Sequence, residues 1–393
     1  MDNNTIIIGL TGPFGSGCTF VAKKFIEKMG YKYISLSDIL RDEFKKVRNE
    51  KESYIRNNLQ EFGNLIRKEN GYDYLSKKVV ELMNSKSNRK QNKWVIDSIR
   101  NTHEIDYLKK LPGKFYLISI WADKETRWNR VKQKYNGNEN TFITDDKRDS
   151  DEKIENGQQI TLCYQMADVV ILNDKKLIEN SADYNDFNKI IERYIKLFEK
   201  EIKFEPTETE TLMTMAYANS LRSSCIKRKV GALIRDDYGN VFSSGYNEVP
   251  SSERSCQSEY GKCYRIYLRE KFDKKVDELL SNESEKNSIK ELYKKEFKNL
   301  DYCRSLHAEE NAIVNMARMG VSFPMERATL YTTTYPCNLC ANKIAQVGIK
   351  NIVYFEPYPM EEAKNILAKH KVTQIPFDGV TYNGYFRLME VLR

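Results

Sequence analysis

The sequence lacks any long hydrophobic run. Within its 393 residues, no stretch approaches the roughly 18 consecutive apolar residues that a membrane-spanning helix needs. The short apolar run from Ile6 to Leu10 follows Met-Asp-Asn-Asn, without the basic region and longer apolar region of a signal peptide. We therefore expect a soluble, cytoplasmic protein that has no membrane partner.

The sequence also lacks a strong excess of charge of either sign. Its 64 basic and 56 acidic residues leave a net charge of +8, spread over a large protein. This mild excess suits anionic ligands such as nucleotides, but it predicts no extended nucleic-acid surface. Cysteine is modest in number, with 8 residues. In the cytosol these thiols stay reduced and are available to bind metal rather than to form disulfides.

Length and pattern indicate two domains of the α/β class. We place the boundary in the polar stretch near 203–207, and so expect a first domain over 1–203 and a second over 204–393. In the first domain, buried strands alternate with helices, which predicts a mostly parallel sheet covered on both faces. The expected strands of this sheet cover 5–9, 94–97, 115–120 and 168–172.

The second domain also alternates strands and helices, and we expect helices on both faces of its sheet. A long excursion over about 250–302 interrupts this pattern. The Lys- and Glu-rich part of the excursion, 269–300, is typical of a solvated helical insertion.

Two short motifs in the second domain carry metal-binding chemistry. They are His307-Ala-Glu309 and Pro336-Cys337-Asn-Leu-Cys340, both at expected helix starts, where the helix dipole favours thiolates. One imidazole and two thiolates can hold zinc and leave a fourth position for water, as in catalytic sites. Glu309 is not needed as a ligand and is suited to transfer protons. This set is the signature of zinc-dependent nucleobase deaminases. The alternative is a structural zinc knuckle.

A glycine-rich loop follows the first expected strand and precedes a helix. The pattern Gly-x4-Gly-x-Thr has the shape of a P-loop, whose N–H groups bind phosphates and whose threonine can contact the Mg²⁺ of a nucleoside triphosphate. The position of the usual lysine is occupied by Cys18, which makes phosphoryl transfer doubtful. The alternative is a plain glycine turn. The loop residues are Gly12, Pro13, Phe14, Gly15, Ser16, Gly17, Cys18 and Thr19.

Several ordered stretches of the second domain resemble the deoxycytidylate deaminase family over about 208–391. They are 224–232, 245–247, 306–313, 331–341 and 347–354. The resemblance implies a cytidine-deaminase-like α/β/α fold, hydrolytic deamination of a deoxycytidine nucleotide and a homo-oligomer. It also implies that Asn247 contacts the sugar hydroxyl and that the backbone of Ala308 meets the base edge. Lys227 and Arg228 are candidates for the substrate phosphate, or they are plain surface charges.

Four cysteines of the second domain remain outside the first metal motif. They could close a second, structural zinc site that holds the insertion, or they could be reduced thiols that pack or lie free. The sequence leaves both open, because the spacing is not that of a paired Cys-x-x-Cys. We expect Cys163, in the first domain, to lie in the core. The four cysteines are Cys225, Cys256, Cys263 and Cys303.

The first domain is similar to the P-loop nucleotide and nucleoside kinases over about 5–175. Arg127 and Arg130 are placed like a kinase lid, and the resemblance implies that Asp97, at a strand end, is a carboxylate of the magnesium site. Its alternative role is a strand-end cap. Together the two domains most resemble the bacterial antiphage dCTP/dCMP deaminases with a fused P-loop domain. This resemblance implies conversion of dCTP or dCMP to dUTP or dUMP plus ammonia, depletion of dCTP in antiviral defence, and a regulatory nucleotide on the P-loop domain.

Three other functions fit part of the pattern. A housekeeping dCMP deaminase could be fused to an active nucleotide kinase, which Cys18 argues against. An RNA or single-stranded DNA cytidine deaminase would need the basic and aromatic strip that this sequence lacks. A metal-stabilised nucleotide sensor without enzymatic activity would need Glu309 to be dispensable.

Overall fold

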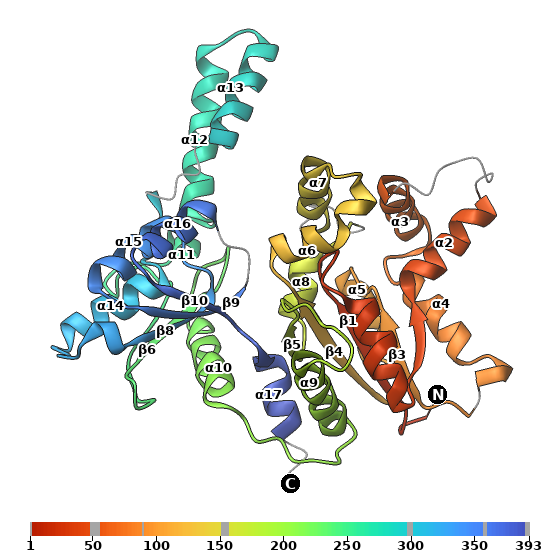
Figure 1. Cartoon of the computed structure of the whole chain (residues 1–393). Helices are drawn as coiled ribbons and strands as arrows, with labels where there is room; N and C mark the ends of the chain where they lie inside the picture. Colours follow the sequence, from red (N-terminus) through yellow and green to blue (C-terminus); the bar gives the residue numbers. More distant parts are fainter. Residues whose placement is uncertain are drawn as a thin grey trace. The chain divides into compact units, whose positions relative to one another are not determined.

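The computed structural model describes residues 2–47, 56–88, 90–150, 157–296, 302–356 and 360–389. The chain forms two compact units (Figure 1). The first unit combines Met1–Pro206 with Asp378–Arg393, and the second unit is Thr207–Phe377. In the described part of the chain, no helix has the length and apolar character to cross a membrane.

The first unit is built on a six-stranded sheet in the order β11-β5-β4-β1-β3-β2. All neighbouring strands are parallel except β11, which is antiparallel to β5. The mostly parallel sheet is therefore confirmed. The short, half-exposed strand β2 was not expected from the sequence. The strands are β1 (Ile6–Thr11), β2 (Lys32–Ser35), β3 (Lys93–Asp97), β4 (Lys114–Trp121), β5 (Val169–Leu172) and β11 (Gly379–Val380).

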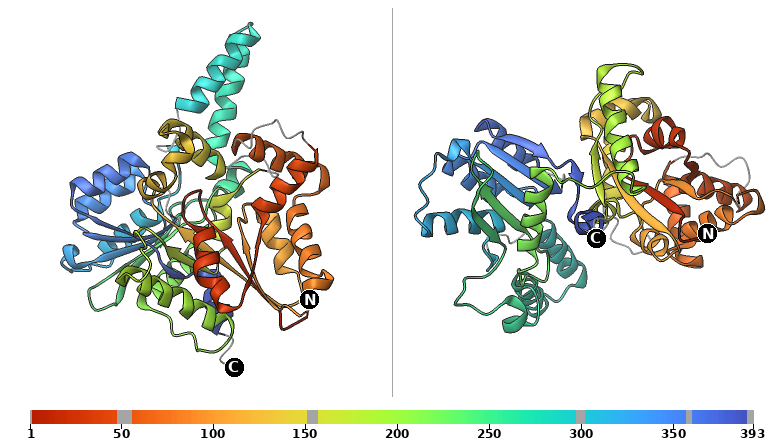
Figure 2. Two further views of the ribbon diagram at one scale, coloured as in Figure 1. Left: turned by 45° about the vertical axis from the view of Figure 1, so that its right-hand side comes forward. Right: turned by 90° about the horizontal axis from the view of Figure 1, so that it is seen from below.

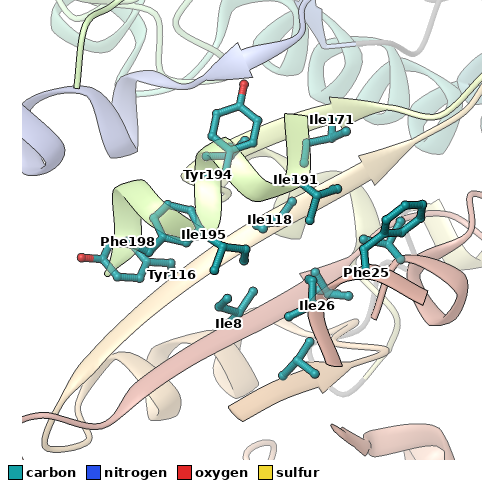
Figure 3. Packing of buried hydrophobic residues seen from close by; sticks show 14 of the residues in the cluster. Ile8, Phe25, Ile26, Tyr116, Ile118, Ile171, Ile191, Tyr194, Ile195 and Phe198 are labelled. Atoms are coloured by element: carbon teal, nitrogen blue, oxygen red, sulfur yellow. The ribbon is translucent and has the colours of Figure 1, made fainter. Parts of the chain in front are cut away.

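Helices cover both faces of this sheet, and the strands are buried on both sides. Successive residues of β1 enter different cores: Ile8 packs with Phe25 and Phe198, whereas Ile7 packs with Trp94. Figure 3 shows the first of these cores, between β1, β4 and the covering helices. This two-sided burial explains the continuous apolar runs of the strands. The helices are α1 (Cys18–Val21), α2 (Leu36–Val47), α3 (Arg56–Asn70), α4 (Tyr74–Met83), α5 (Thr102–Lys109), α6 (Lys124–Val131), α7 (Glu139–Ser150), α8 (Ile160–Gln165) and α9 (Ala182–Phe198).

The end of the chain corrects the expected domain division. We expected 204–393 to form one domain, but the segment from Asp378 onward belongs to the first unit. Strand β11 pairs with β5, and helix α17 (Tyr382–Met389) follows it, as the blue helix beside α9 in Figure 1 shows. A side chain at Gly384 would lie 2.6 Å from the carbonyl oxygen of Asp168, so only glycine allows α17 to approach this closely.

The second unit has a five-stranded sheet in the order β10-β9-β8-β6-β7. Strand β6 is antiparallel to β7 and β8, whereas β8, β9 and β10 are parallel. Gly231 of β6 faces α10, and the next residue, Ala232, shares a core with three other helices, so helices lie on both faces as expected. The elements are α10 (Glu208–Ser220), β6 (Gly231–Arg235), β7 (Val241–Tyr246), α14 (Ala308–Arg318), β8 (Thr329–Thr334), α15 (Asn338–Val347), β9 (Asn351–Glu356), α16 (Glu361–Lys369) and β10 (Thr373–Pro376).

The excursion in the second unit contains α11 (Cys256–Tyr260) and a helical hairpin of α12 (Tyr264–Leu279) and α13 (Glu283–Glu296). The hairpin extends away from the sheet of its own unit, as the left view in Figure 2 shows. The Phe272 and Tyr293 rings stack at 4.0 Å between the two helices, and Lys290 pairs with Asp277 at 2.6 Å. The Lys- and Glu-rich stretch is helical up to Glu296, as its charge pattern predicted. Residues 297–300 lie outside the described ranges.

Candidate metal centre and active site

Two helix starts bring three metal-ligating side chains together. His307 is the N-cap of α14, Cys337 is the N-cap of α15, and Cys340 lies in the first turn of α15. Nδ1 of His307 lies 3.2 Å from Sγ of Cys337 and 3.3 Å from Sγ of Cys340. The three ligand atoms lie within 4.8 Å of one another, and no other such group of three occurs among the residues that the structure describes.

The charges of this group suit a divalent cation. Hydrogen bonding by Cys340, then by His307, lowers the pKa of Cys337 to about 4. The pKa of Cys340 is strongly raised by its contact with Cys337 and by burial, so without metal the two thiols share one negative charge. One imidazole nitrogen and two thiolates are ligands that zinc prefers. The donor set therefore fits zinc.

Glu309 lies beside this group without being one of its three ligands. Its side chain is buried, with Oε2 3.6 Å from Sγ of Cys340, and Oε1 accepts a hydrogen bond from Oγ1 of Thr332 at 3.4 Å. Burial raises the pKa of the Glu309 carboxyl. A buried carboxyl group with few partners next to a metal site can both accept and donate a proton.

The glycine of the Gly-Tyr-Asn stretch sets the position of α14. A side chain at Gly245 would overlap the carbonyl oxygen of Ala308 and the N–H of Ala312. Ala308 is itself fully buried. The absence of a Cβ at residue 245 lets β7 support the helix turn that carries His307 and Glu309.

Asn247 holds the loop before β6 rather than pointing freely into the site. Its Oδ1 accepts a hydrogen bond from N–H of Val230 at 2.7 Å, and its Nδ2 donates to the carbonyl of Arg228 at 2.8 Å. The carbonyl of Asn247 accepts from Oγ of Ser223 at 2.5 Å. An asparagine amide can form about four hydrogen bonds, so capacity for a ligand remains.

The two basic residues proposed for the phosphate differ in their surroundings. Arg228 forms an ion pair with Glu356 at the end of β9. Burial lowers the pKa of Arg228, and the negative charge of Glu309 acts in the opposite direction. Lys227 is exposed, and no ion pair of it is found among the described side chains. Both residues are exposed, and their contact with the substrate phosphate stays a prediction.

Sequence reasoning missed three residues of this site. Thr332 contacts Glu309, and Glu356 pairs with Arg228. Glu310 accepts from N–H of His307 at 3.3 Å and pairs with Lys343 at 2.9 Å. A glutamate three residues after an N-cap is a capping-box signal, so Glu310 could have been found. No sequence signal marks the other two.

The four further cysteines are not brought together as a second metal site. In the described ranges they contribute to no group of three ligands. Burial raises the pKa of the Cys303 thiol, and the charges of Cys225 and Cys263 raise it further. Both readings of these thiols, a second zinc site and packed or free cysteines, stay predictions. Cys163 is fully buried in the core, as expected.

The glycine-rich loop of the first unit joins β1 to α1. Gly15 and Gly17 have φ angles of 89° and 100°, which favour glycine. Oγ1 of Thr19 donates to Oδ2 of Asp97 at 2.6 Å, and the Tyr33 hydroxyl donates to the same oxygen at 3.1 Å. Asp97 is fully buried, and its Oδ1 has no hydrogen-bond partner in the described part of the chain.

Cys18 gives this loop a neutral group where a lysine is usual. Its Sγ lies 3.6 Å from Oγ of Ser16, and burial, with the charge of Asp97, raises the pKa of the thiol to about 12. The backbone carbonyls of the loop are held from outside. Arg130 donates to the carbonyl of Ser16 at 3.4 Å, and Arg127 donates to that of Phe14 at 3.3 Å. The two arginines thus brace the loop in this structure.

Two protein-family models match this chain, one over the metal group and one over the glycine-rich loop. Residues 206–356 match the model of the cytidine and deoxycytidylate deaminase zinc-binding region, and residues 11–140 match that of an AAA domain. The deoxycytidylate deaminase of Schizosaccharomyces pombe is 28% identical over 90% of this chain and 91% of its own length. That of Enterobacteria phage T4 is 33% identical over 38% of this chain and 79% of its own length.

The fold and the metal group define a deaminase with a cytidine-deaminase zinc-binding region, preceded by a P-loop unit of the AAA type. Given its identity to the phage T4 protein over most of that protein's length, the chain belongs to the deoxycytidylate deaminase family, a family of hydrolases. A solved dCMP deaminase of the cyanophage S-TIM5, in complex with dCMP and dUMP, is 25% identical, with a TM-score of 0.31 over 44% of this chain and 99% of that chain.

Proposed function

We propose that the chain hydrolyses deoxycytidine nucleotides, dCMP or dCTP, to the deoxyuridine nucleotide and ammonia. The observation that carries the proposal is the convergence of Nδ1 of His307 with both thiols, at 3.2 and 3.3 Å, beside the buried Glu309. His307, Cys337 and Cys340 would hold the zinc ion.

Zinc, when bound, supplies Lewis-acid chemistry that makes water a good nucleophile near neutral pH. Glu309 accepts the proton that the attacking water loses. It then delivers protons to the ring nitrogen and to the departing amino group, so that water is consumed and ammonia is released. Thr332 orients the carboxyl group through its contact at 3.4 Å. Burial of Glu309 keeps bulk water from competing for these protons.

The substrate would be held by the residues around this group. The buried backbone of Ala308 would meet the base edge, and the remaining hydrogen-bonding capacity of Asn247 would meet the sugar hydroxyl. Arg228 would bind the phosphate once it leaves Glu356. Phosphate and carboxylate compete for the same guanidinium, so substrate binding would release Glu356.

The P-loop unit would bind a regulatory nucleotide without transferring its phosphate. The first N–H groups of a helix are free to bind phosphate oxygens, and the unpartnered Oδ1 of Asp97 beside Thr19 suits Mg²⁺ with a nucleoside triphosphate. The neutral Cys18 supplies no charge to a transferring phosphate. We further propose that the chain depletes dCTP in antiviral defence, that it forms a homo-oligomer and that it is located in the cytoplasm.

A second candidate is a housekeeping role in dCMP metabolism. The Schizosaccharomyces pombe relative carries the name deoxycytidylate deaminase and matches 90% of this chain, which includes most of the P-loop unit. This observation favours dCMP as substrate and a metabolic purpose for the whole two-unit chain.

The test is a product assay on the zinc-loaded chain with dCMP, dCDP, dCTP and cytidine, with and without added ATP and dTTP. Glu309→Gln should lower the rate at least about 100-fold while zinc content, measured by mass spectrometry, stays unchanged. The exposed Glu362→Gln on α16 is the matched control. Full activity of the Glu309 variant would refute the assignment, and activity on dCMP alone would favour the metabolic role.

A further inference from the structure

A basic pocket lies in the first unit, away from the P-loop. It has a volume of about 510 Å³. All four of its charged lining residues are cations, and none is acidic. The lining residues are Lys109, Gly113, Lys114, Phe115, Tyr116, Lys200 and Arg387.

The pocket lies at the opposite end of the sheet from the P-loop. Lys114 begins β4, and its neighbour in β1 is Ile6, whereas the P-loop follows Thr11 at the other end of β1. At about 3.3 Å per residue, the two ends of β1 are roughly 16 Å apart. A ligand in this pocket would therefore be distinct from one on the P-loop.

Helix ends explain only part of this charge. Lys109 ends α5, and Lys200 follows α9, where cations favourably meet the helix dipole in any protein. Arg387 lies in the last turn of α17, so the same reason applies to it. Lys114 begins β4 and has no such reason to be there. Lys109, Lys114 and Lys200 form no ion pair among the described residues. Burial lowers the pKa of Lys114, and the charge of Lys200 lowers it further, so these cations repel each other.

One carboxylate lies beneath the pocket and offsets one of the four charges. Oδ2 of the buried Asp168 lies 2.7 Å from Nη2 of Arg387 and accepts from N–H of Leu117 at 2.8 Å. Nε of Arg387 is buried and has no hydrogen-bond partner in the described ranges. Three positive charges therefore remain for an anion.

The aromatic wall of the pocket is already packed on both faces. The Tyr116 ring stacks on Phe198 at 4.2 Å, as Figure 3 shows, and Arg387 lies over the Tyr116 ring at 4.7 Å. Neither face of this ring is open to a nucleobase. The pocket is thus built to recognise negative charge rather than a base.

We propose that this pocket binds a polyphosphate, either inorganic or as the phosphate chain of a nucleoside triphosphate. Several phosphate oxygens would be shared between the lysines and Arg387, because a multiply charged anion offsets the repulsion among them. Arg387 comes from α17, which the chain reaches only after completing the deaminase unit. The anion would therefore fasten the C-terminal segment onto the P-loop unit.

The experiment titrates the zinc-loaded full-length chain with inorganic tripolyphosphate and, separately, with ATP, by calorimetry. Lys114→Ala combined with Lys200→Ala should weaken tripolyphosphate binding at least about tenfold. Lys28→Ala, an exposed lysine of the same unit, is the matched control and should bind as the unchanged chain does. Hydrogen exchange of the segment 378–389 should slow on adding tripolyphosphate in the unchanged chain but not in the double variant.

Thr19→Val separates this pocket from the P-loop. Tripolyphosphate binding that survives Thr19→Val and is lost in the double lysine variant supports the proposal. Equal affinity for ATP and tripolyphosphate would show that the phosphates alone are recognised, and tighter binding of ATP would add nucleoside contacts to the same site. Unchanged binding in the double variant would overturn the proposal. Deaminase activity and the unfolding temperature establish that each variant is folded.

Discussion

Replacement of Asn247 by alanine separates a positioning role from direct substrate contact. The amide joins N–H of Val230 and the carbonyl of Arg228, at 2.7 and 2.8 Å, and the side chain is buried. Alanine leaves both backbone groups unpaired. A partly buried group that loses its partner costs about 1 kcal/mol or more, so we expect the second unit to lose about 2–3 kcal/mol.

That loss should lower the unfolding temperature of the second unit by roughly 5–10 °C, because a unit of this size shifts about 2–4 °C per kcal/mol. The loop also carries Arg228, so kcat/KM for dCMP should fall with it. Asn247→Asp keeps an acceptor for Val230 but places a negatively charged oxygen against the carbonyl of Arg228. It should therefore be at least as damaging as alanine.

Thermal unfolding of the zinc-loaded chain and steady-state deamination of dCMP test this reasoning together. Asn315→Ala is the matched control, because it removes one hydrogen bond, of 2.9 Å, to the carbonyl of Ser244 on β7 and leaves the 228–230 loop intact. The control should lose about 1 kcal/mol. An unchanged unfolding temperature in Asn247→Ala, with a raised KM, would refute the positioning role and assign the amide to the substrate.

Three further perturbations have defined outcomes. Dialysis against a strong chelator should remove zinc and deaminase activity together, and added zinc but not magnesium should restore both; activity that survives complete zinc removal would contradict the metal assignment. Gly245→Ala should lower zinc content and activity at the same time, since its Cβ would displace the backbone of α14 at Ala308. Arg67→Ala should destabilise the first unit by about 3–5 kcal/mol in denaturant unfolding, because it leaves the fully buried Glu104 without its partner at 2.8 Å.

The parts of the site that sequence could predict are those encoded by adjacent residues. His307 and Cys337 are the N-caps of helices. Their motifs therefore specify both the metal-ligating side chain and the local backbone conformation that orients it. Gly15 and Gly17 likewise need the positive φ angles that the P-loop pattern implies. In the first sheet, strand runs such as Ile6–Thr11 were recognisable because burial on both faces leaves no polar alternation.

The contacts that sequence could not predict join residues far apart in the chain. Arg228 meets Glu356, and Thr332 meets Glu309, without any spacing rule that pairs them. Cysteine content alone could not tell a second zinc site from packed thiols, because only three-dimensional convergence distinguishes them. Asn247 shows a different difficulty. The family pattern marks it as a site residue, but it does not predict the hydrogen bonds of the Asn247 amide to the backbone of Val230 and Arg228.

The return of the C-terminal segment to the first unit means that this unit is not a continuous stretch of the sequence. The second unit, Thr207–Phe377, is therefore an insertion in the sequence of the first unit, which resumes at Asp378. Strand β11 has only two residues, Gly379 and Val380, too few for any periodic signal, yet it covers the edge of β5.

Removing everything after Phe377 would expose the edge of β5 and deprive the buried Asp168 of Arg387, its partner at 2.7 Å. A buried carboxylate without its partner is strongly destabilising, and an open strand edge invites association between chains. Leu172 of β5 also donates to Asp378 at 3.4 Å, and the next residue, Asn173, donates to the carbonyl of Ser16 in the P-loop at 2.8 Å. The returning segment and the phosphate loop thus contact two adjacent residues, the last residue of β5 and the one that follows it. A P-loop fragment that ends at Pro206 would lack one side of its own sheet.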